Sequence, residues 1–489
     1  MKKKVKKVIS LINNNSFNRI IIELILLVSL FSLNPYIGIA LLLVILSEIV
    51  ISNKNENLLY IYIFLSFFDE VLILDVIKGS ISRIVMLFIF FKLGIYIIKN
   101  KIIPNKLQIS VFIFFIASFF IELTTTGLNT ESIVILANIL IFILFSMTIN
   151  LRKTEEINSF VEKLCLTIVF AVINGIMHGI LSNNFLEEIV DYEKNSKIYR
   201  FNGTYEPNFM CMFINLGILS LLTVKDKINK IFYYIFMAIM INFSLLTASI
   251  TGIITLVISF IIYIFLNIKK KKINYLNAIM IIIITFVLFV GIKIVNYPEM
   301  KEVNITGTHE QIKYEEESES KEEKDSEKES ESREEKDSEK ESNNLIEETS
   351  LVQRLNRIKK LIKSGKLDEV TSGRIPLLKT FISKSFSRPL LSVLFGNGLT
   401  NKKIYCAFFH RDCYSHNSYA DFLYNFGIIG FILIMTYMFY KTKKNCFLNM
   451  NITNTKYADN IKMIRILLLL YALSLTLYTK RMFLIFFLL

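Results

Sequence analysis

The feature that most constrains this chain is a series of apolar runs, each about as long as a bilayer is thick. The stretch "SIVILANILIFILFSMTI" at residues 132–149 is one example, and it contains no charged residue. An α-helix needs about 20 mostly apolar residues to cross the hydrocarbon core of a membrane. A soluble chain of 489 residues would instead form two or three domains with alternating apolar and polar positions. The sequence therefore predicts a multi-span membrane protein.

The runs predict an all-α, polytopic bundle of about 13 transmembrane helices. We expect three regions: an N-terminal bundle at 1–296, a large loop at 297–415 that contains short helices, and C-terminal spans at 416–489. The expected spans are residues 18–33, 35–51, 58–77, 81–98, 107–123, 131–149, 159–181, 207–224, 231–247, 249–266, 275–296, 417–440 and 461–478.

The basic residues predict the orientation of these spans. Lysine and arginine concentrate in the cytoplasmic loops of membrane proteins, and strict alternation of the spans places every basic loop on one side. This bias accounts for the net charge of +14 without a nucleic-acid partner. We expect a multi-pass protein of the cytoplasmic (inner) membrane, with loops 182–206 and 297–415 outside. The basic segments are the N-terminal tail and residues 99–106, 151–153, 225–230, 269–272 and 441–444.

Three acidic residues fall inside or beside the third expected span: Asp69, Glu70 and Asp75. A carboxylate at the centre of a bilayer costs a few kcal/mol, so such residues usually face protein or lie near the end of a span. We expect these three to lie near the outer end of the span or to face protein, and we assign them no function.

A highly charged tract interrupts the large loop at residues 308–348. It contains the near-repeat "SKEEKDSEKESE" and "SREEKDSEKES" at 320–331 and 332–342, and residues 310–348 carry 18 acidic and 7 basic side chains. Such a segment buries too little apolar surface to fold, which predicts disorder or a solvated helix. Ion binding is an alternative, but the tract lacks the glycine turn and alternating ligands of a calcium loop.

An amphipathic basic helix is expected at residues 351–366, "LVQRLNRIKKLIKSGK". Its apolar residues recur at helical spacing, with Arg354 and Arg357 on other faces. Three interpretations stay open: a helix on an anionic membrane surface, a basic wall of a site for a phosphorylated lipid, and a solvated helix packed on the outer ends of the spans.

Four residues of metal-binding type lie within eleven positions of one another: Cys406, His410, Cys413 and His416. Their spacing is not that of a standard zinc finger, and we predict no metal site. A Cys406–Cys413 disulfide and two free thiols are equally open interpretations.

Three motifs together give the chain a resemblance to a known family. They are "RFNGTYEPNFMCMF" at 200–213, "TSGRIPLLKTFISKSFSRPLLSVLFGNGL" at 371–399 and "HNSYADFLYNFGIIG" at 416–430. The first resembles the Arg-x-x-Gly followed by Pro-Asn of the O-antigen ligase/polymerase-like (Wzy/WaaL-type) membrane glycosyltransferases. The second resembles the Ser-Gly-Arg and Gly-x-Gly of that family, and the third resembles its His-Asn. The order and spacing of the three stretches also resemble those of the family. The resemblance covers roughly residues 160–440.

The resemblance implies transfer of a glycan from a polyprenyl-diphosphate donor on the outer face of the cytoplasmic membrane. Polymerases of this family join repeat units into a surface polysaccharide such as capsule or O-antigen, and ligases attach the finished glycan to lipid or protein. Ligases often carry a Ser-Arg pair near the end of a middle span. The similar stretch here, "LLTASITGIITL" at 245–256, has Ile250 in place of the arginine, which favours a polymerase.

The implied enzyme works without a metal ion or a cofactor. Its implied partners are the polyprenyl-diphosphate-linked oligosaccharide, membrane lipid and a polysaccharide chain-length regulator.

The implied donor is a diphosphate, for which arginine is the suitable partner. A guanidinium stays charged, binds phosphate through two N–H groups and tolerates partial burial. Arg200 and Arg374 are our first choices as catalytic residues because they stand in the motifs. Arg388, Arg354 and Arg357 are further substrate-binding candidates.

The acceptor is a sugar hydroxyl, whose proton a base with a pKa near 7 can remove. His416 is the candidate base, or a hydrogen-bond donor to the diphosphate, and Glu206 is the second candidate base. Asn208 is a candidate contact to substrate at the start of its span, and Tyr419 is a candidate surface for stacking on sugar.

Structural roles are expected for several neighbours of the candidate base. We expect Asn417 and Ser418 to cap the span that follows His416, and Gly427 and Gly430 to permit close helix packing. His178 is expected to be an ordinary histidine of the bundle.

A transporter or flippase for the same lipid-linked glycan is an alternative of another class. It would show charges in the middle of spans and inverted repeats, and the sequence shows no internal repeat among the spans. A non-catalytic assembly subunit is a third alternative, and it would leave the three motifs unexplained.

Overall fold

The computed structural model describes the parts of the chain that contain the three motifs, with gaps. The described residues are 16–52, 54–69, 71–74, 79–127, 129–149, 151, 153–181, 186–191, 196–201, 203–268, 359, 363–364, 373–400, 402–407, 411–439 and 455–475. The acidic tract at 308–348, the expected span at 275–296, and Glu70, Asp75 and His410 lie outside them.

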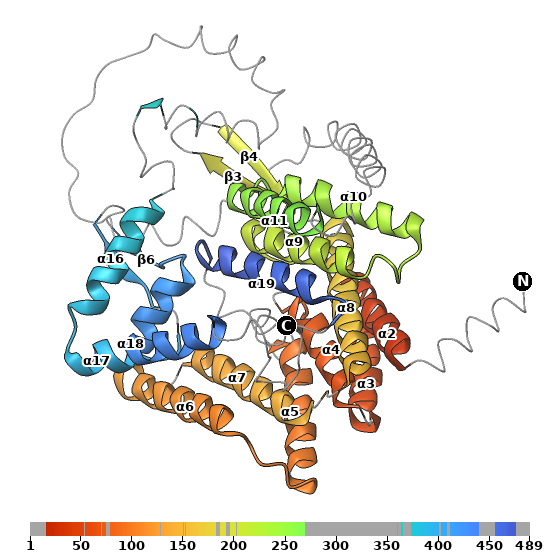
Figure 1. Ribbon diagram of the computed structural model, residues 1–489, viewed down its shortest axis with the longest axis horizontal. Helices are drawn as coiled ribbons and strands as arrows, with labels where there is room; N and C mark the ends of the chain where they lie inside the picture. Colours follow the sequence, from red (N-terminus) through yellow and green to blue (C-terminus); the bar gives the residue numbers. More distant parts are fainter. Residues whose placement is uncertain are drawn as a thin grey trace, which may run out of the picture.

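The described part is mostly helical, as the apolar runs predicted. The helices are α2 (Ser16–Leu33), α3 (Pro35–Ile51), α4 (Asn55–Ser66), α5 (Ile81–Lys99), α6 (Lys106–Thr126), α7 (Thr130–Thr148), α8 (Thr154–Leu181), α9 (Pro207–Thr223), α10 (Lys230–Leu246), α11 (Ile250–Ile268), α16 (Arg374–Phe386), α17 (Leu390–Phe395), α18 (Ser418–Phe439) and α19 (Ala458–Ala472) (Figure 1).

Five of these helices are long and apolar enough to cross a membrane: α5, α6, α7, α8 and α18. Shorter apolar helices lie within α3, α9, α10 and α11. This composition supports an all-α, multi-pass membrane protein, but it does not confirm a total of 13 spans.

Asparagine side chains begin several of the helices. The side chain of Asn105 accepts a hydrogen bond from the backbone N–H of Gln108, and the Gln108 side chain accepts one from Asn105, which forms a capping box at α6. Such caps satisfy N–H groups that have no partner inside the helix. Asn34 at α3, Asn129 at α7 and Asn229 at α10 also cap their helices, because their side chains accept a hydrogen bond from a backbone N–H in the first turn.

One expected span ends early. Helix α4 stops at Ser66 instead of continuing through 58–77, and the chain turns into the short strands β1 (Ile73–Leu74) and β2 (Gly79–Ser80). The turn is stabilised by polar groups, because Ser82 at the start of α5 donates a hydrogen bond to the Asp69 carboxylate. Asp69 therefore faces protein, which is one of the two expected environments.

The three described sheets are small, two-stranded and antiparallel. The loop at 182–206, which was expected to lie outside the membrane, contains the hairpin of β3 (Leu186–Asp191) and β4 (Ser196–Phe201). The third sheet pairs β5 (Ile404–Cys406) with β6 (Arg411–Cys413). The all-α prediction therefore holds for the bundle and misses these hairpins.

Helices from both ends of the sequence pack together around the candidate site. Helix α19 packs against α9 and α11, and α18 packs against α16 and α17 (Figure 1). The segment between β4 and α9 is tied to the end of α4, because the Tyr205 hydroxyl donates a 2.7 Å hydrogen bond to the Ser66 carbonyl. This packing brings the segments 200–208, 247–251, 373–374 and 415–417 toward one another.

Candidate functional site

Arg200 is a buried arginine near the end of β4, with 6% of its surface exposed. Its Nε donates a 2.8 Å hydrogen bond to the Thr247 carbonyl, and Nη2 donates a 3.0 Å bond to Oδ1 of Asn208. A buried guanidinium requires such acceptors because its charge is costly to remove from water. Arg200 thus joins the hairpin to the start of α9 and to the end of α10.

Asn208 lies at the centre of this polar group. Its Oδ1 accepts from Arg200 and, at 2.9 Å, from the Ser249 hydroxyl, while its Nδ2 donates to the carboxylate of Glu206. Glu206 is exposed and immediately precedes Pro207, the first residue of α9. A proline fits that position because the first helical N–H needs no partner inside the helix. The side chain of Asn208 is thereby fixed next to an accessible carboxylate.

The turn between α10 and α11 contributes further polar groups to the candidate site. It contains Ala248 at a positive φ of 48°, which is strained for a residue with a side chain. The turn exposes the Thr247 carbonyl to Arg200 and the Ser249 hydroxyl to Asn208. Thr251, the second residue of α11, accepts a 3.1 Å hydrogen bond from Nη1 of Arg374.

A buried hydrogen-bond network supports this turn from inside the bundle. Asn215 of α9 donates to the Gly252 carbonyl at 2.9 Å and to the Tyr471 hydroxyl at 2.7 Å, and its Oδ1 accepts from Ser244 at 2.9 Å. These four residues come from α9, α10, α11 and α19, so the network fixes four helices beneath the site. A buried network of this kind stabilises one arrangement because every polar group in it needs its partner.

Arg374 is the first residue of α16 and is half-buried. The helix begins at Gly373, whose positive φ of 71° places the arginine at the turn into the helix. Burial lowers the pKa of Arg374 and the Glu206 carboxylate opposes this shift. The guanidinium remains charged at every working pH, and it stands at a helix N-terminus, an environment that favours anions.

His416 precedes α18 and has a positive φ of 50°, a backbone conformation that is strained for histidine. The residues on both sides hold it there. The buried Ser415 donates a 2.5 Å hydrogen bond to the Asp421 carboxylate, and its hydroxyl accepts a 2.9 Å bond from the backbone N–H of Asn417. The geometry of His416 is therefore set by side chains of α18 and its cap.

Asn417 and Ser418 were both expected to cap α18, and the structure shows the cap at Asn417. The side chain of Asn417 accepts 3.0 Å hydrogen bonds from the backbone N–H groups of Tyr419 and Ala420, so Asn417 caps α18. Ser418 makes a different contact. Its hydroxyl donates a 2.6 Å bond to the Leu475 carbonyl, which ties α18 to the segment after α19.

Charges from the other two motifs act on His416. Burial and then the positive charge of Arg374 lower the pKa of His416 below its ordinary value, and the Glu206 carboxylate opposes them. The side chain nevertheless keeps access to solvent. The structure thus brings an imidazole, a guanidinium and a carboxylate within electrostatic range of one another, each from a different sequence motif.

A comparison with known protein families identifies the part of the chain that contains two of these motifs. Residues 235–435 match the family model described as O-antigen ligase. This match supports an O-antigen ligase/polymerase-like family for the matched part of the chain. The match contains Arg374 and His416, whereas Arg200, Glu206 and Asn208 precede it. No curated protein and no solved structure matches the chain.

Members of this family are glycosyltransferase-like membrane enzymes that act on lipid-linked oligosaccharide. For an O-antigen ligase/polymerase-like protein, the described cluster has the relevant chemistry: cationic groups for phosphate and two groups that accept protons.

Arg388 lies outside this cluster. It follows the far end of α16 from Arg374, and a helix of 13 residues is about 20 Å long. Its Nη1 donates a 2.9 Å hydrogen bond to the Tyr424 carbonyl, and its guanidinium carbon lies 4.2 Å from the centroid of the Tyr424 ring. These contacts attach α16 to α18, so the structure gives Arg388 a packing role and does not bring it to Arg374.

Tyr419, a further candidate for substrate contact, has a structural partner. The Tyr419 hydroxyl donates a 3.0 Å hydrogen bond to the Leu469 carbonyl, which joins α18 to α19. Arg354 and Arg357, with the amphipathic segment that contains them, lie outside the described residues. His178 lies half-buried near the end of α8.

The cysteines of the third sheet are free thiols. Cys406 is buried and pairs across the sheet with Arg411, and Cys413 pairs with Ile404. The disulfide interpretation is therefore not supported. Among the described residues, no group of three histidine, cysteine or acidic side chains is arranged to hold a metal ion.

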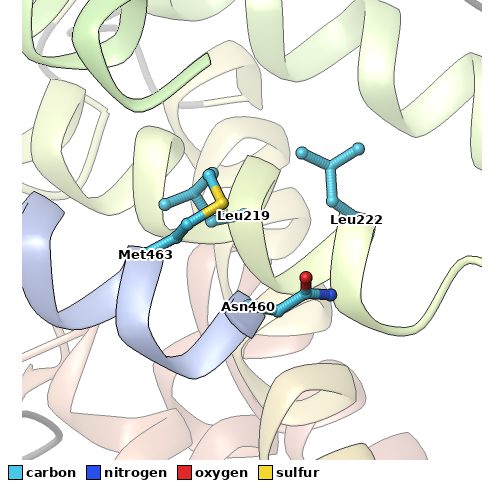
Figure 2. Close-up of a pocket in the computed structure, with 4 residues that line it drawn as sticks. All are labelled: Leu219, Leu222, Asn460 and Met463. Atoms are coloured by element: carbon cyan, nitrogen blue, oxygen red, sulfur yellow. The ribbon is translucent and has the colours of Figure 1, made fainter. Parts of the chain in front are cut away.

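A small pocket between α9 and α19 is separate from the candidate site. Figure 2 shows its lining: Leu219 and Leu222 of α9, and Asn460 and Met463 of α19. The site lies at the first turn of α9 and beyond the last turn of α19, so the pocket stands at the opposite end of both helices. It is narrow and mostly apolar, and it does not suit a charged diphosphate.

Several residues of the cluster were missed by sequence reasoning: Thr247, Ser249, Thr251, Ser415 and Asp421. The only available signal was the local sequence "TASIT" at 247–251, where three hydroxyl residues interrupt two apolar runs. Hydroxyl side chains are common at helix ends, so this pattern alone does not predict a site.

Proposed function

We propose that this protein polymerises polyprenyl-diphosphate-linked oligosaccharide repeat units into a surface polysaccharide. The observation that carries the proposal is the convergence of Glu206, Arg374 and His416, which come from three sequence-distant motifs. The family relationship supplies the substrate class, a lipid-linked oligosaccharide. The site is proposed to open on the extracytoplasmic face of the cytoplasmic membrane, where the lipid-linked units are joined.

In the proposed reaction, a hydroxyl oxygen of the acceptor sugar attacks the anomeric carbon of the donor glycan. The new carbon–oxygen bond forms as the bond between that carbon and the diphosphate oxygen breaks, and the electron pair leaves with the diphosphate. Arg374 neutralises the charge that develops on this leaving group. The acceptor proton passes to Nδ1 or Nε2 of His416, whose lowered pKa keeps it neutral and able to accept.

The other polar residues have supporting roles in this scheme. Both described hydrogen bonds of Arg200 are made to protein, so we assign it to positioning Asn208 and the 247–249 turn. Asn208 orients Glu206, which is the second candidate base and a candidate contact to the sugar. The reaction as proposed needs neither a metal ion nor a cofactor.

Ligation of the glycan to a separate lipid or protein is the second candidate function. The description of the matching family model favours it. The arginine that ligases often carry in a middle span is replaced here by Ile250, the first residue of α11, and this substitution favours the polymerase.

Reconstitution with a defined donor separates the alternatives. The purified protein in liposomes would receive a polyprenyl-diphosphate-linked repeat unit with no other acceptor, and the products would be separated by size. A ladder of products that grows by one repeat unit supports polymerisation. A single product that forms only after a separate acceptor lipid is added supports ligation. Movement of the intact donor across the bilayer without a new glycosidic bond supports transport, and either of the last two results contradicts the polymerase proposal.

The proposed product is a capsule or O-antigen type polymer, and a polysaccharide chain-length regulator is the proposed protein partner. The ladder experiment tests this partnership directly, since adding such a regulator should narrow the distribution of product lengths. An unchanged distribution would contradict it.

A further inference from the structure

Helix α16 presents two different apolar faces. Leu377, Phe381 and Ser385 are buried, and the two apolar residues among them pack against β5 and the start of α18. Ile375, Ile382 and Phe386 form a second stripe, displaced by roughly a third of a turn on the helix. This second stripe is exposed, with 55% of the Phe386 surface accessible. The core of the protein therefore accounts for one apolar face of α16 and leaves the other uncovered.

The exposed stripe continues into α17. Leu390 and Leu391 each expose 71% of their surface, and Phe395 is also exposed. Isolated exposed apolar residues are common on proteins, but a contiguous patch of large ones indicates an interaction surface. Helices α16 and α17 together form this surface, which we call the apolar ledge: Ile375, Ile382, Phe386, Leu390, Leu391 and Phe395.

The charges around the apolar ledge are all positive. Residues 374–395 contain four basic side chains and no acidic one. Both lysines of α16 are exposed: Lys379 lies within the ledge stripe, about one turn from Ile375 and from Ile382, and Lys384 lies on the opposite side of the helix. An apolar face bordered by lysine and arginine is typical of helices that lie at the surface of an anionic bilayer. The lysine stems add apolar length while their ammonium groups reach the headgroups.

The apolar ledge lies next to α6 and α18, two helices that are long and apolar enough to cross a membrane. The loop that follows α17 is anchored to α6, because the backbone N–H groups of Leu399 and Thr400 donate to the buried Glu122 carboxylate at 2.6 and 3.1 Å. Near this anchor, Phe120 and Leu123 of α6 are exposed. Helix α17 also packs along α18, and both α6 and α18 are long and apolar enough to span a membrane (Figure 1).

We propose that the apolar ledge inserts into the bilayer leaflet on the side of the candidate site. The occupant is the lipid of that leaflet, since the ledge is continuous with the exposed apolar surface of α6 and is bordered only by positive charge. Insertion places Arg374, the first residue of α16, close to the level of the lipid headgroups. A diphosphate attached to a lipid lies at that level. The inference concerns the docking of α16 and α17, and it holds whichever glycan transfer the site performs.

The absence of tryptophan from the chain permits a direct test, because one introduced tryptophan is the only one present. Full-length protein would carry Phe386→Trp or Leu391→Trp in nanodiscs that contain anionic lipid. Lys384→Trp is the matched control, since Lys384 is exposed on the side of α16 opposite the ledge. Tryptophan fluorescence would be measured with brominated lipids, which quench from within the bilayer, and with acrylamide, which quenches from water. Size-exclusion chromatography would confirm that each variant is folded and monodisperse.

We expect both ledge variants to emit at shorter wavelength than the control and to lose fluorescence in brominated lipid while resisting acrylamide. The Lys384→Trp control should show the reverse pattern. Quenching of both ledge variants by acrylamide alone would overturn the proposal, because the ledge would then face water. Protection from both quenchers would also overturn it, since that result indicates cover by a protein partner or a second copy of the chain.

Discussion

At the scale of single residues, the most informative feature is the strained backbone of His416. A left-handed conformation costs a non-glycine residue about 1–3 kcal/mol, so neighbouring contacts must hold it in place. Ser415 provides them, with one hydrogen bond to Asp421 and another from the backbone of Asn417. The histidine is therefore oriented by residues that do not themselves reach the substrate.

Replacing Ser415 should lower turnover while leaving the fold intact. Ser415→Ala removes both hydrogen bonds beside His416, and we expect kcat to fall about tenfold, equivalent to about 1.4 kcal/mol. The KM for the donor should change little, because Arg374 remains in place. Ser385→Ala is the matched control, since the hydroxyl of this buried serine donates within α16, to the Phe381 carbonyl at 2.7 Å. Equal losses in the two variants would contradict a specific role for Ser415.

The charges around His416 predict opposite shifts of the pH profile in two variants. Arg374 lowers the pKa of His416 and Glu206 raises it. If neutral His416 is the base, activity falls as pH drops below this pKa. Arg374→Gln should therefore move the acidic limb of kcat/KM to higher pH, and Glu206→Gln should move it to lower pH. The kcat/KM of each variant, measured between pH 5 and pH 8, tests the prediction. A shift of the acidic limb in the same direction in both variants would contradict it.

Sequence reasoning reached some of these residues and missed others for a physical reason. The asparagine cap at Asn417 was predictable, because a cap depends on atoms two or three positions away in the chain. The partner of Ser418 was not, because its acceptor at Leu475 is 57 residues distant. Glu206, Arg374 and His416 were identified through their motifs, whereas the hydroxyl groups around them acquire their roles only through tertiary contacts.

At the scale of elements, α17 packs closely against a break in α18. Gly396 ends α17 at a positive φ of 83°, and an added Cβ would lie 1.9 Å from the Asn425 carbonyl oxygen. Gly427 interrupts α18 at φ 64°, where an added Cβ would lie 2.5 Å from the backbone of Leu394. Gly430 packs as closely against the ring of Phe114. The predicted role of Gly427 and Gly430 in close packing is confirmed.

A methyl group at the first of these glycines should destabilise the protein. Gly396→Ala introduces both backbone strain and a clash with the Asn425 carbonyl, and we expect a loss of more than about 1–3 kcal/mol, the cost of the strain alone. The thermal midpoint in detergent should fall measurably. Gly94→Ala is the control, because an added Cβ on α5 meets nothing within 4 Å. A thermal midpoint that is equal in both variants would contradict the close contact.

The apolar runs predicted most helices to within a few residues, and two kinds of element were missed. Helix α4 is shorter than expected because Ser66 and Asp69 turn the chain before the apolar run ends. The β3–β4 hairpin was missed because its strands are short, and short strands carry a weak periodic signal. Span length follows from bilayer thickness, but the position of a turn depends on its tertiary partners.

At the scale of the whole molecule, the catalytic unit should be independent of the acidic tract. Residues 308–348 lie outside the described structure, and their composition cannot support a packed core. Deletion of 320–342 should leave the rate of polymerisation within about twofold of the unmodified protein, a change below 0.5 kcal/mol. The rate per mole of membrane protein is the measurement. Loss of activity at normal expression would show that the tract contributes directly.

The whole arrangement depends on segments that are far apart in the chain and meet on one side of the bundle. Residues 200–208, 247–251, 374 and 415–417 are brought together by α9, α11, α16 and α18, and the supporting network adds α19. The matched O-antigen ligase stretch covers only part of this set. The segment before it therefore belongs to the proposed catalytic unit as much as the matched stretch does.

The most direct test of the central claim is the rate of chain growth by purified protein in liposomes supplied with polyprenyl-diphosphate-linked repeat units. Arg374→Ala and His416→Ala would be compared with the unmodified protein and with Arg83→Ala, an exposed arginine of α5 away from the cluster. Loss of a group that stabilises charge or transfers a proton costs roughly 10²–10³-fold. The account predicts losses of that size in both site variants and a normal rate in Arg83→Ala. Normal chain growth by Arg374→Ala and His416→Ala would contradict it.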